Sequence, residues 1–105
     1  MAYEDLAPKE FLAAYNEQKD NAVLLDVRTA AEIEDANIDG HIAIDIQQPG
    51  FIEKVGALDK GKTYFVYCRS GNRSGQACRF MATQGFEKLY NLKGGMIALM
   101  DTDFE

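Results

Sequence analysis

The chain alternates short apolar runs with amphipathic stretches, and this alternation predicts an α/β domain with a mainly parallel sheet. Two runs, 22–27 and 42–46, are apolar on both faces, as expected of buried parallel strands. The run 63–67 has the best strand pattern because every residue in it is β-branched or aromatic. A further short strand is predicted over 87–91.

Helices are predicted between these strands. Pro8 suits a first helical turn, and Phe11, Leu12 and Tyr15 share one side of a helix from Pro8 to Gln18. The other helices are expected, in chain order, over Ala30–Asp35, over Pro49–Ala57 with a weaker pattern, over Ser74–Gln84, and from Gly94-Gly95 onward.

Composition agrees with one water-soluble globule, and we expect a single domain over residues 1–105. The chain is 47% hydrophobic and 27% charged, which allows both a core and a solvated surface. Its apolar runs are far shorter than the roughly 20 residues that cross a bilayer. The acidic start does not resemble a secretory signal, so a cytoplasmic protein without membrane contact is expected. The tail from Asp101 is expected to be frayed.

The net charge of −6 is unevenly distributed. Residues 60–86 contain no acid and hold five of the 11 basic residues, which are Lys60, Lys62, Arg69, Arg73 and Arg79. Such a local field favours a small anionic ligand in an otherwise acidic protein. The chain lacks the extended basic face that nucleic acid requires.

The positions of the two cysteines favour free thiols, and not a metal site or a disulfide. Cys68 and Cys78 are ten positions apart, and the chain has a single histidine. This spacing forms no Cys-x-x-Cys pair and no zinc set, so neither a metal nor a disulfide is expected. In a reducing compartment both thiols are free.

Cys68 follows the best predicted strand and precedes a predicted helix, which is where open parallel sheets bind ligands. Gly71 and Asn72 tolerate positive φ, so the loop between strand and helix can turn its N–H groups inward. The helix dipole and the guanidinium groups of Arg69 and Arg73 add positive charge. We therefore predict that Cys68 is a thiolate near neutral pH.

Three segments resemble single-domain rhodaneses. Cys68-Arg69-Ser70-Gly71-Asn72-Arg73-Ser74 resembles the family's active-site loop. Leu24-Leu25-Asp26-Val27-Arg28, with Glu32 after it, resembles the early strand and its acid-containing helix. Tyr90-Asn91-Leu92-Lys93-Gly94-Gly95 resembles the late strand and double glycine. The segments stand in family order, and the likeness covers about residues 6 to 100.

The resemblance implies a rhodanese-like α/β fold, with a central, mainly parallel five-stranded sheet flanked by helices on both faces. It places Cys68 at the bottom of a shallow pocket, as the catalytic residue of a ping-pong sulfurtransferase that carries a persulfide. The donor would be a small sulfur anion such as thiosulfate, and the acceptor cyanide or a thiol, including a protein thiol. No metal or organic cofactor is implied. The implied substrate-binding residues are Arg69, Ser70, Gly71, Asn72, Arg73 and Ser74, with the two arginines on the donor's sulfonate.

Other polar residues are interpreted as structural. Asp26 and Arg28 lie near the predicted site at a strand end, and Arg28 stands four residues before Glu32, where the two can pair. The family's usual histidine position holds Asn37, so His41 is not its counterpart. Cys78 is assigned to the core.

Two other functions remain open. A persulfide carrier or sensing module that acts with a protein partner would use the same loop. A cysteine phosphatase or arsenate reductase is less favoured, because such phosphatases have five residues between cysteine and arginine. Cys68 and Arg73 enclose four.

Overall fold

The computed structural model describes residues 3–102, and its strands form one five-stranded sheet in the order β1-β5-β4-β2-β3. Every neighbouring pair is parallel, so the predicted fold class is confirmed. The strands are β1 (Glu4–Leu6), β2 (Ala22–Asp26), β3 (Ile42–Ala43), β4 (Thr63–Tyr67) and β5 (Lys88–Leu92). The end of the tail that was expected to be frayed, from residue 103, lies outside the described residues.

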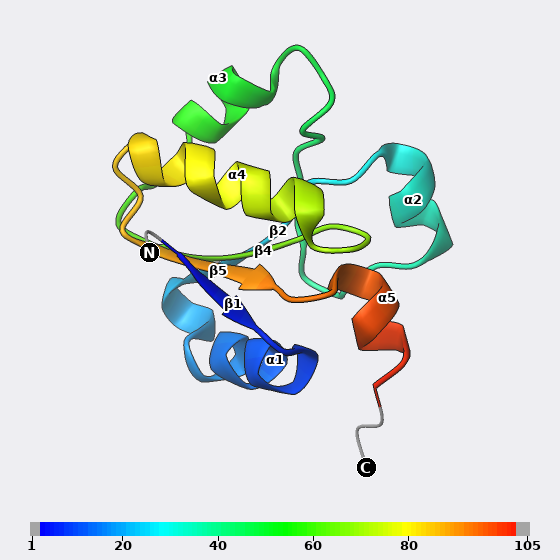
Figure 1. The fold of residues 1–105 in the computed structure, drawn as a ribbon. Helices are drawn as coiled ribbons and strands as arrows, with labels where there is room; N and C mark the ends of the chain where they lie inside the picture. The colour runs from blue at the N-terminus through cyan, green and yellow to red at the C-terminus, as the bar shows by residue number, and fades with distance from the viewer. Residues whose placement is uncertain (1–2, 103–105) are drawn as a thin grey trace.

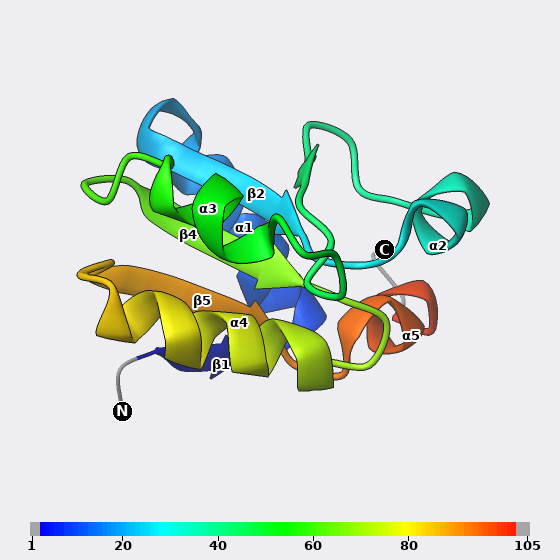
Figure 2. The same ribbon diagram turned by 90° about the horizontal axis from the view of Figure 1, so that it is seen from above.

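Helices cover both faces of the sheet. In Figures 1 and 2, α3 and α4 lie on one face and α1 on the other, while α2 and α5 lie near the carboxyl ends of the strands. The helices are α1 (Pro8–Glu17), α2 (Ala30–Asp35), α3 (Phe51–Gly56), α4 (Asn72–Thr83) and α5 (Gly95–Met100), with a 3-10 turn at Lys19–Asn21. Within residues 3–102, none of them has the length and apolar character of a bilayer span.

Strand β4 divides the core and thereby positions the cysteine. Tyr64 and Val66 pack into the cluster on the side of α3 and α4, whereas Phe65 and Tyr67 pack into the cluster on the side of α1. Alternate residues of a strand point to opposite faces. Cys68 continues this alternation and joins the cluster below α4.

Two strands differ from the sequence-based prediction. The run 42–46 was expected to be a buried strand, but β3 contains only Ile42 and Ala43, which are exposed at the sheet edge. The next residues stay beside β2 through single hydrogen bonds, such as Ile44 N–H to the Asp26 carbonyl at 2.9 Å. Strand β1 was not located, because Glu4–Leu6 is too short and polar to show a strand pattern.

Candidate active site

Cys68 stands between the end of β4 and the start of α4, in a loop that turns back on its own sulfur. Gly71 has φ of 96°, the left-handed region that favours glycine. Its N–H donates to Cys68 Sγ at 3.1 Å, and the Ser74 hydroxyl lies 3.3 Å from the same sulfur. Asn72, which also tolerates positive φ, is instead the first residue of α4, and Gly71 is the residue of this loop that has positive φ.

These donors determine the ionisation of the thiol. Burial by itself would raise the pKa of Cys68. The Ser74 hydroxyl and the backbone N–H groups of Ser74, Gly71 and Ser70 outweigh that effect and lower this pKa below the usual thiol value. Hydrogen bonds to the charged form of a group act in this direction.

The family resemblance had implied that Cys68 lies at the bottom of a shallow pocket, but its sulfur is buried. Cys68 is 0% exposed. A pocket of about 350 Å³ lies beside it and is lined by Arg69 but not by Cys68. The two residues that follow the cysteine, Arg69 and Ser70, are exposed, whereas the cysteine itself is buried.

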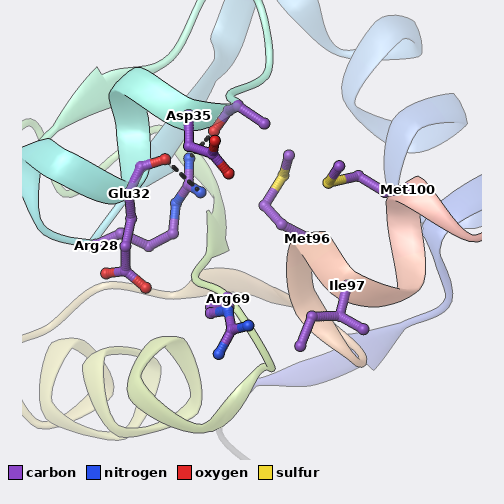
Figure 3. A pocket seen from close by; sticks show the side chains of 8 residues that line it. Arg28, Glu32, Asp35, Arg69, Met96, Ile97 and Met100 are labelled. Carbon is purple, nitrogen blue, oxygen red and sulfur yellow. Dashed lines mark hydrogen bonds between the residues drawn. The ribbon is translucent and has the colours of Figure 1, made fainter.

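The pocket lies between α2 and α5 (Figure 3). Arg69 is exposed at its edge, and Met96, Ile97 and Met100 of α5 form one wall. The opposite wall comes from α2 and the end of β2, and consists of Arg28, Glu32, Asp35 and Ala36. The pocket therefore has one apolar wall and one polar wall.

Arg73 is not among the residues that line this pocket, and its guanidinium is paired with Glu32, which does line it. Its guanidinium donates two hydrogen bonds, of 2.8 and 2.7 Å, to the Glu32 carboxylate. Glu32 also forms a capping box with Thr29 at the start of α2. Arg73 chiefly, together with Thr29 and against the opposing effect of burial, lowers the pKa of Glu32 from 4.5 to about 2. The ion pair joins α2 to α4.

The predicted pairing of Arg28 with the Glu32 side chain is wrong, because Asp26 takes its place. Arg28 and Asp26 are buried, and their closest N–O distance is 2.7 Å. The Arg28 guanidinium also donates to the backbone carbonyls of Ala36, at 2.6 Å, and Glu32, at 3.3 Å. Arg28 thus ties the end of β2 to backbone carbonyls in the last turn and at the C-cap of α2.

The double glycine supports the cysteine loop from behind. Gly95 has φ of +61°, and a Cβ built there would lie 2.4 Å from the Arg69 carbonyl carbon and oxygen. This close approach lets Met96 N–H reach the Cys68 carbonyl at 2.9 Å and Ile97 N–H reach the Arg69 carbonyl at 3.0 Å. The start of α5 therefore fixes the backbone on either side of the Cys68–Arg69 peptide bond.

Sequence reasoning missed a polar network behind Ser74. Asn91 is buried in β5, and its Oδ1 lies 2.5 Å from Ser74 Oγ. Its Nδ2 faces Asp5 Oδ1 at 2.9 Å and the Gly71 carbonyl at 3.2 Å. An asparagine between the apolar residues Tyr90 and Leu92, at the end of a predicted strand, was the available signal, because a buried polar group needs partners.

The remaining candidates, Cys78 and His41, lie outside the Cys68 loop. Burial raises the pKa of Cys78 to about 12, which keeps it a neutral thiol in the core below α4. His41 Nδ1 lies 2.9 Å from the Ile38 carbonyl, within a local turn.

A parallel sheet that presents a cysteine to inward-facing N–H groups at a helix start defines an α/β domain able to hold a sulfur anion. Residues 7–101 match the Rhodanese-like domain family. The chain belongs to that family, as the resemblance of its three motifs predicted.

The chain is similar to several proteins of this kind. It is 39% identical to the putative sulfurtransferase YtwF of Bacillus subtilis, over 78% of this chain and 77% of that protein. It is 38% identical to the tRNA uridine(34) hydroxylase of Cytophaga hutchinsonii over 88% of this chain, which spans only 30% of that longer protein. A rhodanese-related protein from Thermoplasma volcanium has a similar structure, with a TM-score of 0.78, 27% identity, and coverage of 98% of this chain and 96% of that one.

Proposed function

We propose that the chain is a single sulfurtransferase domain that carries sulfane sulfur as a persulfide on Cys68. The observation that carries the proposal is the pair of donors, Gly71 N–H and the Ser74 hydroxyl, within 3.3 Å of Cys68 Sγ. Hydrogen-bond donors at this distance favour negative charge on sulfur, and a thiolate is the nucleophile that sulfur transfer needs. A relative named sulfurtransferase, with similar length, supports the same class of reaction.

The proposed reaction has two half-reactions and needs no external oxidant or reductant. In the first, the Cys68 thiolate attacks the outer sulfur of a donor such as thiosulfate. The donor's S–S bond breaks, sulfite leaves with the electron pair, and Cys68 becomes a persulfide. In the second, cyanide or a thiolate attacks the terminal sulfur, and Cys68 leaves as a thiolate. The products are sulfite and either thiocyanate or a new persulfide.

We assign the donor's sulfonate to Arg69. This side chain is exposed at the edge of the pocket, where a guanidinium can form paired hydrogen bonds with an oxyanion. Arg73 is bound to Glu32 and contributes its charge from the other side of the loop. The N–H groups of Ser70, Gly71 and Ser74 then hold the sulfur itself.

The burial of Cys68 favours one alternative, a persulfide carrier that a protein partner opens. A donor reaches the sulfur only after loop residues above it move, and a docking protein could drive that movement. Turnover with free thiosulfate and cyanide separates the two functions. Turnover that is slow alone and rises sharply with a partner thiol protein would support the carrier.

Arg73 also bears on the phosphatase alternative. A phosphatase needs its loop arginine on the substrate phosphate, whereas the Arg73 guanidinium donates two hydrogen bonds to the Glu32 carboxylate. We expect no Cys68-dependent hydrolysis of an aryl phosphate. Such hydrolysis would reverse this ranking.

The sulfurtransferase proposal is tested by intact-mass analysis after addition of thiosulfate. Wild type and Cys78→Ser should each gain one sulfur atom, and Cys68→Ser should gain none. Steady-state rates with thiosulfate and cyanide should give parallel double-reciprocal lines, the signature of a ping-pong mechanism. An adduct that persists in Cys68→Ser would contradict the assignment.

A further inference from the structure

The orientation of the Asn91 side-chain amide is fixed by two of its partners. Its Nδ2 faces the Gly71 carbonyl, which can only accept a hydrogen bond, and the Asp5 carboxylate, which when ionised can also only accept. A flipped amide would place Oδ1 against both acceptors. Nδ2 must therefore face Gly71 and Asp5, and Oδ1 must face Ser74.

The Ser74 hydroxyl has one proton, and two acceptors lie within its reach. Asn91 Oδ1 is 2.5 Å from Ser74 Oγ, and Cys68 Sγ is 3.3 Å from the same oxygen. A hydroxyl donates a single hydrogen bond at a time. The nearer acceptor, Asn91 Oδ1, has no other hydrogen-bond donor among residues 3–102.

The thiol and anionic forms of Cys68 require the Ser74 proton in different positions. When Cys68 is a thiol, the S–H can donate to Ser74 Oγ while the hydroxyl donates to Asn91, so all three groups are satisfied. When Cys68 is an anion, it needs the Ser74 proton for itself. Ser74 Oγ and Asn91 Oδ1 then face each other in a buried site with no proton between them, which is unfavourable.

We infer that Asn91 is a positioning residue that holds the Ser74 proton away from Cys68 and so restrains the anionic form of the sulfur. The inference builds on the proposed function, in which that anion is the nucleophile. The cradle then has two kinds of donor. The backbone N–H groups always face the sulfur, whereas the Ser74 hydroxyl is shared with Asn91.

A substitution can test this without changing any charge near the sulfur. The titratable and charged groups around Cys68 are Arg69 from the loop, Arg73 and Cys78 from α4, Asp5 from β1 behind Asn91, and Glu32 and Asp45 next to Arg73. Asn91→Leu retains the branched shape of the side chain and leaves all of these groups in place. A change in the ionisation midpoint of Cys68 then measures the effect of the hydrogen bond between Ser74 and Asn91.

The experiment is a titration of the ultraviolet absorbance of the Cys68 thiolate, taken as the difference from the matching Cys68→Ser protein. Asn91→Leu should lower the midpoint by about one pH unit, the size expected of one hydrogen bond to a charged group. Ser74→Ala should raise it. In the Ser74→Ala background, Asn91→Leu should have no further effect.

A purely structural role for Asn91 predicts the opposite sign. Loss of its bond to the Gly71 carbonyl would loosen the loop and raise the midpoint. An unchanged or raised midpoint in a folded Asn91→Leu protein, or a decrease that persists in the Ser74→Ala background, would overturn the inference. Asn91→Ala removes the same acceptor without added bulk and gives a second measurement. Because the titration requires neither donor nor acceptor, its outcome is independent of whether sulfur transfer occurs.

Discussion

Gly95→Ala should destabilise the domain through the cysteine loop. The added Cβ would lie 2.4 Å from the carbonyl carbon and oxygen of Arg69 and 2.5 Å from Ser70 N, and all three are backbone atoms that cannot rotate away. The residue also has φ of +61°, where a side chain with a Cβ costs about 1–2 kcal/mol. Overpacking adds roughly 1–3 kcal/mol, so we expect a total loss of about 2–5 kcal/mol.

Urea unfolding measures this loss, and Gly56→Ala is the matched control. Gly56 has no atom within 4 Å of a built Cβ and does not have positive φ. Its substitution should change stability by no more than about 1 kcal/mol. The Cys68 ionisation midpoint should rise in Gly95→Ala only, because the displaced Arg69 and Ser70 backbone carries part of the cradle. Equal stability of the two variants would refute the close packing of Gly95 on the loop.

Three further predictions concern the surroundings of the loop. Glu32 has a folded-state pKa of about 2 against an ordinary 4.5, so its stabilisation is complete above pH 4.5 and is lost as pH falls toward 2. Glu32→Gln should remove this part of the pH dependence of the unfolding free energy, and an unchanged acid profile would contradict the ion pair with Arg73. Asp26→Asn should cost about 3–5 kcal/mol in urea unfolding, because it leaves the buried Arg28 cation uncompensated, and a loss below about 1 kcal/mol would count against this. Alkylation of the native protein near pH 8 should modify Cys68 and not Cys78, as peptide mapping would show, and equal modification of both would contradict the raised pKa of Cys78.

Much of the fold was predictable, because its central strands β2, β4 and β5 are rich in apolar residues. The prediction for β4 matched at both ends, and those for β2 and β5 were within one residue at each end. The edge strands were harder to predict, since each pairs with one neighbour only and needs little apolar character. Strand β1 is short and acidic at its first two positions, and β3 leaves the sheet after two residues.

The Cys68 loop was predictable from the order of its residues, but the contacts that join it to other helices and strands were not. The order of Cys68, Gly71 and Ser74 indicated a loop that encloses a sulfur anion, and the N–H directions agree with it. The pairing of Arg73 with Glu32 joins residues 41 positions apart and depends on how α2 and α4 are placed. The position of Asn91 behind Ser74 likewise depends on which strands are neighbours.

The cradle around Cys68 is tested most directly by the ionisation midpoint of this thiol in the wild-type protein. The measurement is the pH dependence of thiolate absorbance, with the Cys68→Ser spectrum subtracted at each pH. The donors at Gly71 and Ser74 predict a midpoint below the ordinary value of 9.0. A midpoint at or above that value would contradict the stabilisation of a sulfur anion at this position.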